Sequence, residues 1–362
     1  MEQPAQSNKP PGDAFRQQKL KAWQPIMTPL KVVAIFVAIG VCFIPTGVSL
    51  MSASNSIYEK RIMYDGSNQA VSCSIDEANE GKQCQITFVF DEDADGPIYV
   101  YYELENFYQN HRRYVSSRDQ YQLQGDSVSK SDLETTCESL VTNGSLLLNP
   151  CGLIANSYFS DVITLDTVNS SPSSVTLDES GIAWKSDDEK FKQPSGFKYV
   201  EVADFTSSCA DNGLNGNCKQ YTASDGTKYL YYYPNDDTVQ YLYESYPDQI
   251  SPIDGVTDEH FKVWMRPAAL PQFRKLYGKV DQDYKKGDTL SFNVVANYEV
   301  ASFDGSKAIL ISNLGEFGGK NPFLGVAYVV VGSISLMFAF LFVVKQSIAP
   351  RDKANASMLN WT

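Results

Sequence analysis

The sequence predicts a membrane protein in which two transmembrane helices flank a large, mainly antiparallel β-sandwich ectodomain with helical and loop insertions. Each end of the 362-residue chain carries an apolar run long enough to cross a bilayer. Between the two runs, aromatic and β-branched residues alternate with turn residues, a composition typical of strands. Six of the seven cysteines also lie in this middle segment, which indicates an oxidising compartment.

The first apolar run covers residues 30–51 and holds one charge, Lys31. At about 1.5 Å per residue it spans the roughly 30 Å hydrocarbon core of a bilayer. Pro45 and Gly47 are expected to kink or unwind its last turns where a neighbouring helix covers the freed carbonyls. A cleaved signal peptide is the alternative, but its apolar region is normally only about 7–15 residues long. A transmembrane helix is therefore the preferred interpretation.

The second apolar run covers residues 323–344 and holds no charge. Gly325, Gly332 and Ala339 recur at every seventh position, so they share one helix face. Small residues on one face let another helix approach closely. Together with Pro45 and Gly47, they are predicted to mediate helix packing, with the packing partner left open. The alternative is that small residues are simply common in membrane spans.

Lysine and arginine near the ends of the spans predict the orientation, because such residues are enriched on the cytosolic side. They are more numerous beside the two tails than beside the middle segment. Both tails are therefore expected in the cytosol. The predicted segments are a cytosolic tail (1–29), a first span (30–51), a luminal or extracellular domain (52–322), a second span (323–344) and a cytosolic tail (345–362).

The middle segment is expected to be disulfide-bridged and glycosylated. Its cysteines group by proximity as Cys73 with Cys84, Cys137 with Cys151, and Cys209 with Cys218; other pairings remain open. Zinc binding is the competing explanation, but no C-x-x-C spacing or histidine pair supports it. Acceptor triplets for N-glycans begin at Asn143 and Asn169. Two further triplets, at Asn355 and Asn360, lie in the tail that is predicted to be cytosolic.

Strand-like runs begin near residues 84, 97, 228, 238, 289 and 307, and the first two are expected to form a hairpin around an acidic turn at 91–96. Helices are expected around 104–113 and 268–277. The sequence contains no G-x-S-x-G or H-E-x-x-H motif, and it has only two histidines, His111 and His260. We therefore expect no enzyme activity, no cofactor and no metal site. The net charge of −13 also argues against a nucleic-acid partner.

Three arginines, Arg112, Arg113 and Arg118, form a local basic cluster within an acidic chain. They either pair internally with carboxylates or meet an acidic partner surface. Internal pairing is the preferred interpretation.

Several stretches together resemble the ligand-effect-modulator family, the accessory subunits of type-IV P-type ATPases. They occur in the family's order across nearly the whole chain. The stretches are Phe15-RQQKLKAWQPIMTP, Phe43-IPTG, Asn106-FYQNHRRYVSSRD, Pro150-CGLIANSYFSD, Gly181-IAWKSD, Trp264-MRPAALPQFRKLYG and Gly318-GKNPFLG.

The resemblance implies a non-catalytic subunit that forms a heterodimer with the ATPase, escorts it out of the endoplasmic reticulum, and supports its transfer of aminophospholipids to the cytosolic leaflet. It also implies residence in the endoplasmic reticulum, Golgi, endosomes or plasma membrane, among membrane lipids. Cys137–Cys151 and Cys73–Cys84 match family bridges, whereas Cys209–Cys218 rests on proximity alone. The cytosolic residues implied to contact the ATPase are Phe15, Arg16, Lys19, Lys21 and Trp23.

Two other classes of protein share part of this pattern. A free-standing receptor or adhesion protein would also carry bridges, glycans and a β-sandwich, but a second span gives it no clear advantage. A membrane-tethered hydrolase would need a nucleophile and a base, and the sequence offers no such pair.

Overall fold

The protein is described from a computed structural model, which describes residues 13–15, 20, 27–66, 73–75, 81–169, 171–172, 175–206, 208–214, 217–315 and 318–350. The chain divides into two compact units. One comprises Met1–Ser54 with Asn321–Thr362, and the other comprises Asn55–Lys320.

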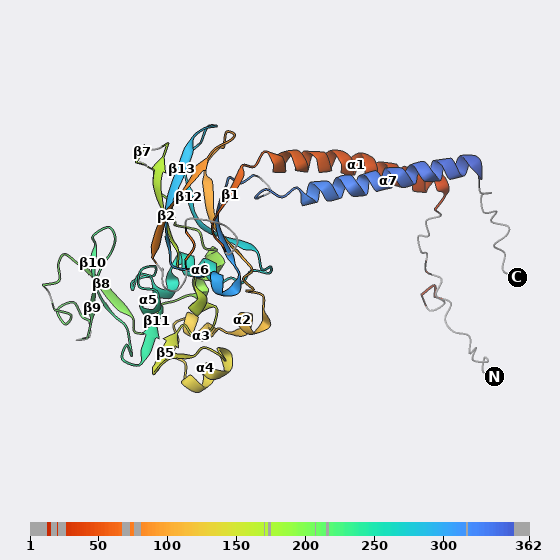
Figure 1. Cartoon of the computed structure of the whole chain (residues 1–362). Coiled ribbons are helices and arrows are strands. Elements are labelled where there is room, and N and C mark those ends of the chain that lie inside the picture. The colour runs from red at the N-terminus through yellow and green to blue at the C-terminus, as the bar shows by residue number, and fades with distance from the viewer. Residues whose placement is uncertain are drawn as a thin grey trace, which may run out of the picture. The chain divides into compact units, whose positions relative to one another are not determined.

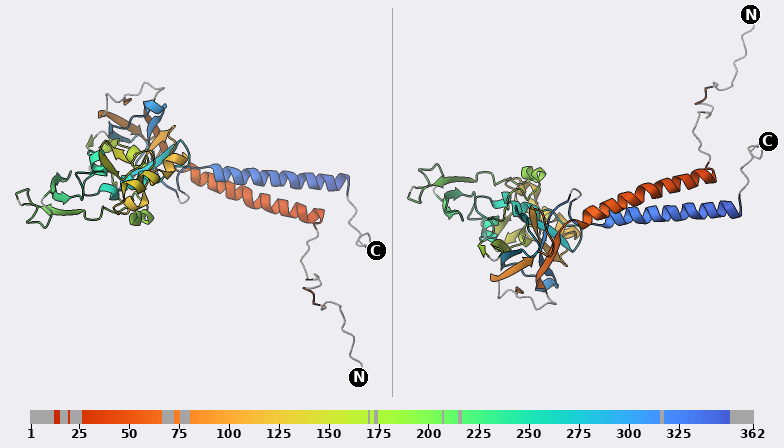
Figure 2. Two further views of the ribbon diagram at one scale, coloured as in Figure 1. Left: turned by 90° about the horizontal axis from the view of Figure 1, so that it is seen from below. Right: turned by 90° about the horizontal axis from the view of Figure 1, so that it is seen from above.

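The first unit is a pair of long helices, α1 (Pro29–Asn55) and α7 (Phe323–Ile348). The two helices lie side by side in every view of Figures 1 and 2. Both are long and apolar enough to cross a membrane, and most of their side chains face outward. Aromatic rings also bridge the pair: the ring centroids of Phe43 and Tyr328 are 4.9 Å apart. This architecture is that of a two-span membrane protein.

Of the predicted kink or unwinding in the last turns of the first span, the unwinding is wrong. α1 continues through Pro45 and ends at Asn55. Proline has no N–H for the backbone ladder, and the neighbouring Thr46 hydroxyl donates a 2.7 Å hydrogen bond to the carbonyl of Cys42. This bond goes to the carbonyl of Cys42, whereas the proline deprives the carbonyl of Val41, four residues before it, of its usual donor.

The second unit is built around two four-stranded antiparallel sheets, with strand orders β1-β14-β3-β12 and β2-β13-β6-β7. The strands of the first sheet are β1 (Glu59–Gly66), β14 (Ser306–Ser312), β3 (Ile98–Glu105) and β12 (Phe273–Val280). Those of the second are β2 (Lys82–Val89), β13 (Thr289–Ala296), β6 (Val162–Val168) and β7 (Ser171–Pro172).

The two sheets share one hydrophobic core, which confirms the predicted sandwich. Strand β2 buries every second side chain, the alternation expected of a sheet with one face in the core. In β14 every residue is buried. The hydroxyl of Tyr277 on β12 accepts a 2.9 Å hydrogen bond from the backbone N–H of Ile163 on β6, so a polar contact also joins the sheets.

Two small sheets and several short helices are inserted into this sandwich. The sheets are β8-β10-β9, which projects from the sandwich in Figure 1, and β11-β5-β4. Their strands are β8 (Lys198–Val202), β10 (Lys228–Tyr232), β9 (Lys219–Thr222), β11 (Val239–Tyr241), β5 (Leu146–Asn149) and β4 (Thr142–Asn143). The α-helices are α2 (Arg112–Ser116), α3 (Gln120–Leu123), α4 (Lys130–Thr136), α5 (Leu242–Ser245) and α6 (Glu259–Trp264). The 3-10 helices are η1 (Ala155–Ser157), η2 (Lys185–Lys190), η3 (Gly255–Thr257) and η4 (Ala301–Phe303).

Three local predictions are wrong. Strands β2 and β3 belong to different sheets, so the acidic turn between them is a crossover and not a hairpin. Its Asp93 accepts a 2.9 Å hydrogen bond from the N–H of Lys286 in the chain before β13. The helix expected around 104–113 does not form: β3 extends to Glu105, Asn106 has a positive φ, and α2 begins only at Arg112. The helix expected around 268–277 is absent. This segment is a proline-containing loop followed by β12, because prolines break a helical pattern.

Disulfides join Cys73 to Cys84, Cys137 to Cys151 and Cys209 to Cys218, the pairs favoured by proximity. Cys137 and Cys151 are fully buried in a small core of their own with Leu133, Val141 and Leu148. Cys209 and Cys218 are only partly buried.

Replacing both Cys137 and Cys151 with alanine is expected to lower the free energy of unfolding by about 2–5 kcal/mol. The loss includes the 14-residue chain constraint and the packing of the small core. Urea titration of the purified variant measures it. The matched control replaces Cys209 and Cys218, whose loop is 9 residues and whose sulfurs are less buried. An equal loss in both variants would contradict a special role for the small core.

Candidate functional site

The first candidate site is the interface between α1 and α7, which is lined by small residues. The residues that α1 buries are Gly40, Gly47 and Ser54, and those that α7 buries are Gly325, Gly332, Ser335 and Ala339. A β-carbon added to Gly47 would lie 2.7 Å from the carbonyl oxygen of Gly325, and one added to Gly325 would lie 2.8 Å from that of Gly47. The two backbones touch at this crossing, which only glycine permits.

Four of the five predicted packing residues are buried between the two helices, and one is exposed. Gly47, Gly325, Gly332 and Ala339 lie in the interface, and their partner is the other helix of the same chain. Pro45 is exposed on α1, so it does not pack against α7, and its packing against another partner stays a prediction.

Sequence reasoning missed Gly40 and Ser54. With Gly47 they repeat at seven-residue intervals along α1, the same spacing that identified the α7 face. The matching period in both spans was therefore the signal for an intramolecular pair. At the end of the interface, the hydroxyl of Ser54 accepts a 2.9 Å hydrogen bond from the N–H of Asn321.

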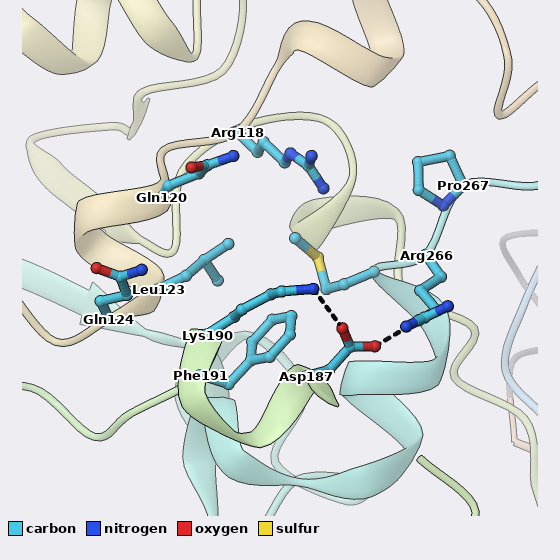
Figure 3. A pocket seen from close by; sticks show the side chains of 10 residues that line it. Arg118, Gln120, Leu123, Gln124, Asp187, Lys190, Phe191, Arg266 and Pro267 are labelled. Carbon is cyan, nitrogen blue, oxygen red and sulfur yellow. Dashed lines mark hydrogen bonds and ion pairs between the residues drawn. The ribbon is translucent and has the colours of Figure 1, made fainter. Parts of the chain in front are cut away.

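The second candidate site is a pocket of about 470 Å³ in the sandwich unit. Its floor is apolar, formed by Leu123, Phe191 and Met265, and its walls carry polar and charged side chains (Figure 3). The wall residues are Arg118, Gln120, Gln124, Asp187, Lys190, Arg266 and Pro267. We call this site the basic pocket.

The wall that carries Arg118 is held by the adjacent residues. Ser117 donates a 2.7 Å hydrogen bond to the carbonyl of Cys137, which ties the loop to a disulfide. Asp119 caps α3 by accepting a 2.8 Å hydrogen bond from the N–H of Gln122, and it also accepts one of 3.0 Å from the Thr136 hydroxyl. The backbone on both sides of Arg118 is therefore fixed while its own side chain extends into the pocket.

The opposite wall comes from η2 and from the chain that follows α6. Lys275 on β12 donates hydrogen bonds to three backbone carbonyls at the end of α6, those of Val263, Trp264 and Arg266, at 2.6–2.9 Å. A lysine ammonium has three donors, so all are used. This contact positions Arg266.

Asp187 pairs with two of the three pocket cations. It accepts hydrogen bonds from Arg266 and, at 2.7 Å, from Lys190. The hydrogen bond from Arg266, followed by that from Lys190, lowers the pKa of Asp187. The bond to Asp187 in turn raises the pKa of Arg266. One carboxylate against Arg118, Lys190 and Arg266 leaves the lining residues with a formal charge of +2.

The preferred interpretation of the arginine cluster is wrong. Within the described part of the chain, Arg112, Arg113 and Arg118 have no carboxylate partner within 4.0 Å. Arg112 and Arg113 are exposed, and Arg118 is half-buried. The cluster therefore leaves its positive charge available to a ligand or partner.

The two histidines lie apart. His260 Nε2 is 2.8 Å from the carboxylate of Glu179, beside the ring of Tyr277, as expected of a histidine in a polar network. His111 is exposed before α2.

The other predicted site residues are at the surface or outside the described residues. The acceptor residues Asn143 and Asn169 are both exposed. Phe15 is 76% exposed. Arg16, Lys19, Lys21 and Trp23 lie outside the described residues, as do the tail triplets.

Comparison with known proteins yields a family and several relatives. The sequence model of the LEM3 (ligand-effect modulator 3) family / CDC50 family matches residues 50–352. Cell cycle control protein 50A of Bos taurus is 36% identical, over 94% of this chain and 90% of its own. ALA-interacting subunit 3 of Arabidopsis thaliana is 34% identical, over 98% and 91%.

A third relative is the phospholipid-transporting ATPase accessory subunit CRF1 of Saccharomyces cerevisiae. It is 30% identical, over 98% of this chain and 89% of its own. Each alignment extends over both long helices and the disulfide-bridged sandwich between them. The chain belongs to the LEM3 (ligand-effect modulator 3) / CDC50 family.

Proposed function

We propose that this protein is the non-catalytic accessory subunit of a phospholipid-translocating P-type ATPase, with which it forms a heterodimer. The observation that carries the proposal is the alignment over 98% of this chain with a relative named as such a subunit. The architecture fits this role, because a glycine-packed helix pair and a disulfide-bridged domain provide binding surfaces on both the membrane and the aqueous side.

The physical contribution of such a subunit is binding energy. A partner that binds the folded ATPase and not its unfolded chain stabilises the folded form by mass action.

The outer faces of α1 and α7 are apolar and exposed in this chain, for example at Val41 and Phe340, so they can pack against further helices within lipid. The sandwich unit caps the luminal loops of the ATPase, and the tail around Phe15 contacts its cytosolic parts. ATP hydrolysis and lipid transfer remain with the ATPase.

The test of this role is co-purification. A tagged copy of the full chain, purified in mild detergent, is expected to bring a stoichiometric ATPase whose hydrolysis an aminophospholipid stimulates. Alanine at both Phe15 and Trp23 is expected to weaken that association without changing the stability of the sandwich unit. A stable monomer without ATPase, under conditions that preserve related complexes, would contradict the proposal.

The proposed orientation places both tails in the cytosol and the sandwich unit in the lumen of the endoplasmic reticulum, Golgi or endosomes, or outside the plasma membrane. Glycan mapping tests it. Asn143→Gln and Asn169→Gln are each expected to remove one glycan, since both residues are exposed. Asn355→Gln and Asn360→Gln are the matched controls and are expected to change nothing. A glycan on either tail residue would reverse the orientation.

A further inference from the structure

We propose that the basic pocket binds a phosphate ester of a small organic molecule. The proposal goes beyond the accessory role and stands without it, because it depends only on the residues of the sandwich unit. It concerns the space between Arg118 on one wall and the group formed by Lys190, Asp187 and Arg266 on the other (Figure 3).

The charge of the pocket indicates an anion. Three cationic side chains converge on one space, and the single lining carboxylate, Asp187, already pairs with Lys190 and Arg266. Arg118 has no acceptor for its guanidinium among the residues the structure describes. Cations that share a site repel one another unless an anion lies between them. In a chain with a net charge of −13, such a local excess of positive charge is unusual.

The placement of the donors favours a phosphate over a carboxylate. Arg118 precedes α3, Lys190 ends η2 and Arg266 follows α6, so the cations approach from three different segments. A carboxylate presents two oxygens in one plane, whereas a phosphate ester presents oxygens in several directions. Arginine and lysine are the residues that proteins use most for phosphate, through charge-assisted hydrogen bonds. Gln120 and Gln124 add neutral donors on the same side as Arg118.

The size and floor of the pocket indicate that the phosphate carries an organic group. A volume of about 470 Å³ falls in the range of sites for small organic ligands, about 300–1,000 Å³. The buried side chains of Leu123, Phe191 and Met265 form an apolar floor on which the carbon part of an ester can lie. A phospholipid headgroup and a soluble phosphate ester both have this organic group, whereas free phosphate shares only their anionic part.

Calorimetric titration of the full chain, in maltoside micelles and phosphate-free buffer, tests the proposal. The probes are glycerophosphoserine, inorganic phosphate and glycerol. Glycerophosphoserine is expected to bind saturably and glycerol is not. If inorganic phosphate binds as tightly as the ester, free phosphate is the source; if the ester binds about tenfold or more tightly, the organic group contributes on the apolar floor.

Variants identify the pocket as the place of binding. Arg118→Gln is expected to weaken glycerophosphoserine binding by about 10- to 100-fold, the range for one charge-assisted hydrogen-bonding group. Lys190→Gln is a second variant, and since this side chain is 60% exposed it leaves folding intact. Arg112→Gln removes the same charge from a neighbouring exposed position outside the pocket and is the matched control.

Three results would overturn the proposal. One is the absence of saturable binding for both phosphate probes. Another is an equal loss in Arg112→Gln and Arg118→Gln, which would indicate general electrostatic attraction. The third is binding of a tetraglutamate peptide without binding of either phosphate probe, which would make the pocket a site for an acidic segment of a protein partner.

Discussion

Replacing Lys307 with methionine is expected to lower the free energy of unfolding of the sandwich unit by about 3–5 kcal/mol, the cost of leaving buried charges without their partner. Lys307 lies on β14 with its side chain fully buried. Its ammonium is 2.8 Å from the carboxylate of Asp161 and 3.3 Å from that of Asp65. It also donates to the carbonyl of Tyr298 at 2.5 Å.

The location of this cluster explains the size of the effect. Asp65 and Lys307 belong to the first sheet, whereas Asp161 directly precedes β6 of the second. Asp161 also accepts hydrogen bonds from the Tyr64 hydroxyl at 2.7 Å and from the backbone N–H of Tyr298 at 2.6 Å. Burial, followed by the charge of Asp161, raises the pKa of Tyr64, so its hydroxyl remains a donor. The ammonium therefore holds the two sheets together at a point that water does not reach.

Urea titration measures the loss, and Lys285→Met is the matched control. Lys285 also pairs with a carboxylate, that of Asp93 at 3.1 Å, but its side chain is 71% exposed. Exposed pairs contribute little, so no measurable change is expected there. Adding Asp65→Asn and Asp161→Asn to Lys307→Met removes the stranded charges and should recover part of the loss. Equal stability of the Lys307 and Lys285 variants would refute a structural role for the cluster.

Replacing Gly325 with leucine is expected to separate α1 from α7 and to destabilise the helix pair by about 1–3 kcal/mol, the usual cost of overpacking. An added β-carbon would lie 2.9 Å from the backbone N of Met51 and 2.8 Å from the carbonyl oxygen of Gly47. These are backbone atoms, which cannot rotate away as a side chain can. The helices must move apart along their length, and the contacts near Phe43 and Gly332 are lost with them.

A cysteine pair at Phe36 and Phe342, in a Cys42→Ala background, reports this separation. The two rings are 6.0 Å apart, so a short bifunctional maleimide joins the cysteines only while the helices are paired. The concentration of SDS that halves cross-linking in mixed micelles is expected to fall in Gly325→Leu. Ser333→Leu adds a similar side chain to the exposed face of α7 and should leave this SDS concentration unchanged. If Ser333→Leu lowers the SDS concentration equally, contact at the glycines does not hold the helix pair together.

The sequence by itself determined the features that depend on local pattern. The mainly apolar runs at 30–51 and 323–344 correspond to α1 and α7, because the thickness of a bilayer sets the length of a spanning helix. The alternation in β2 and the β-branched run in β14 predicted strands for the same reason: the side-chain period is local. Proximity also sufficed for the three disulfides, since short loops bring cysteines together most readily.

Only the tertiary structure decided what depends on contacts between distant segments. Neighbouring strands β2 and β3 enter different sheets, because hydrogen-bonding partners come from residues about 200 positions away. Pro45 is exposed while Gly40 is buried, since the rotation of α1 against α7 selects the covered face. Arg118 reads as part of one arginine run, yet it separates from Arg112 and lines a pocket with Lys190 and Arg266. Lys190 and Arg266 come from η2 and from the chain after α6. No local pattern in the sequence predicts that these segments lie beside Arg118.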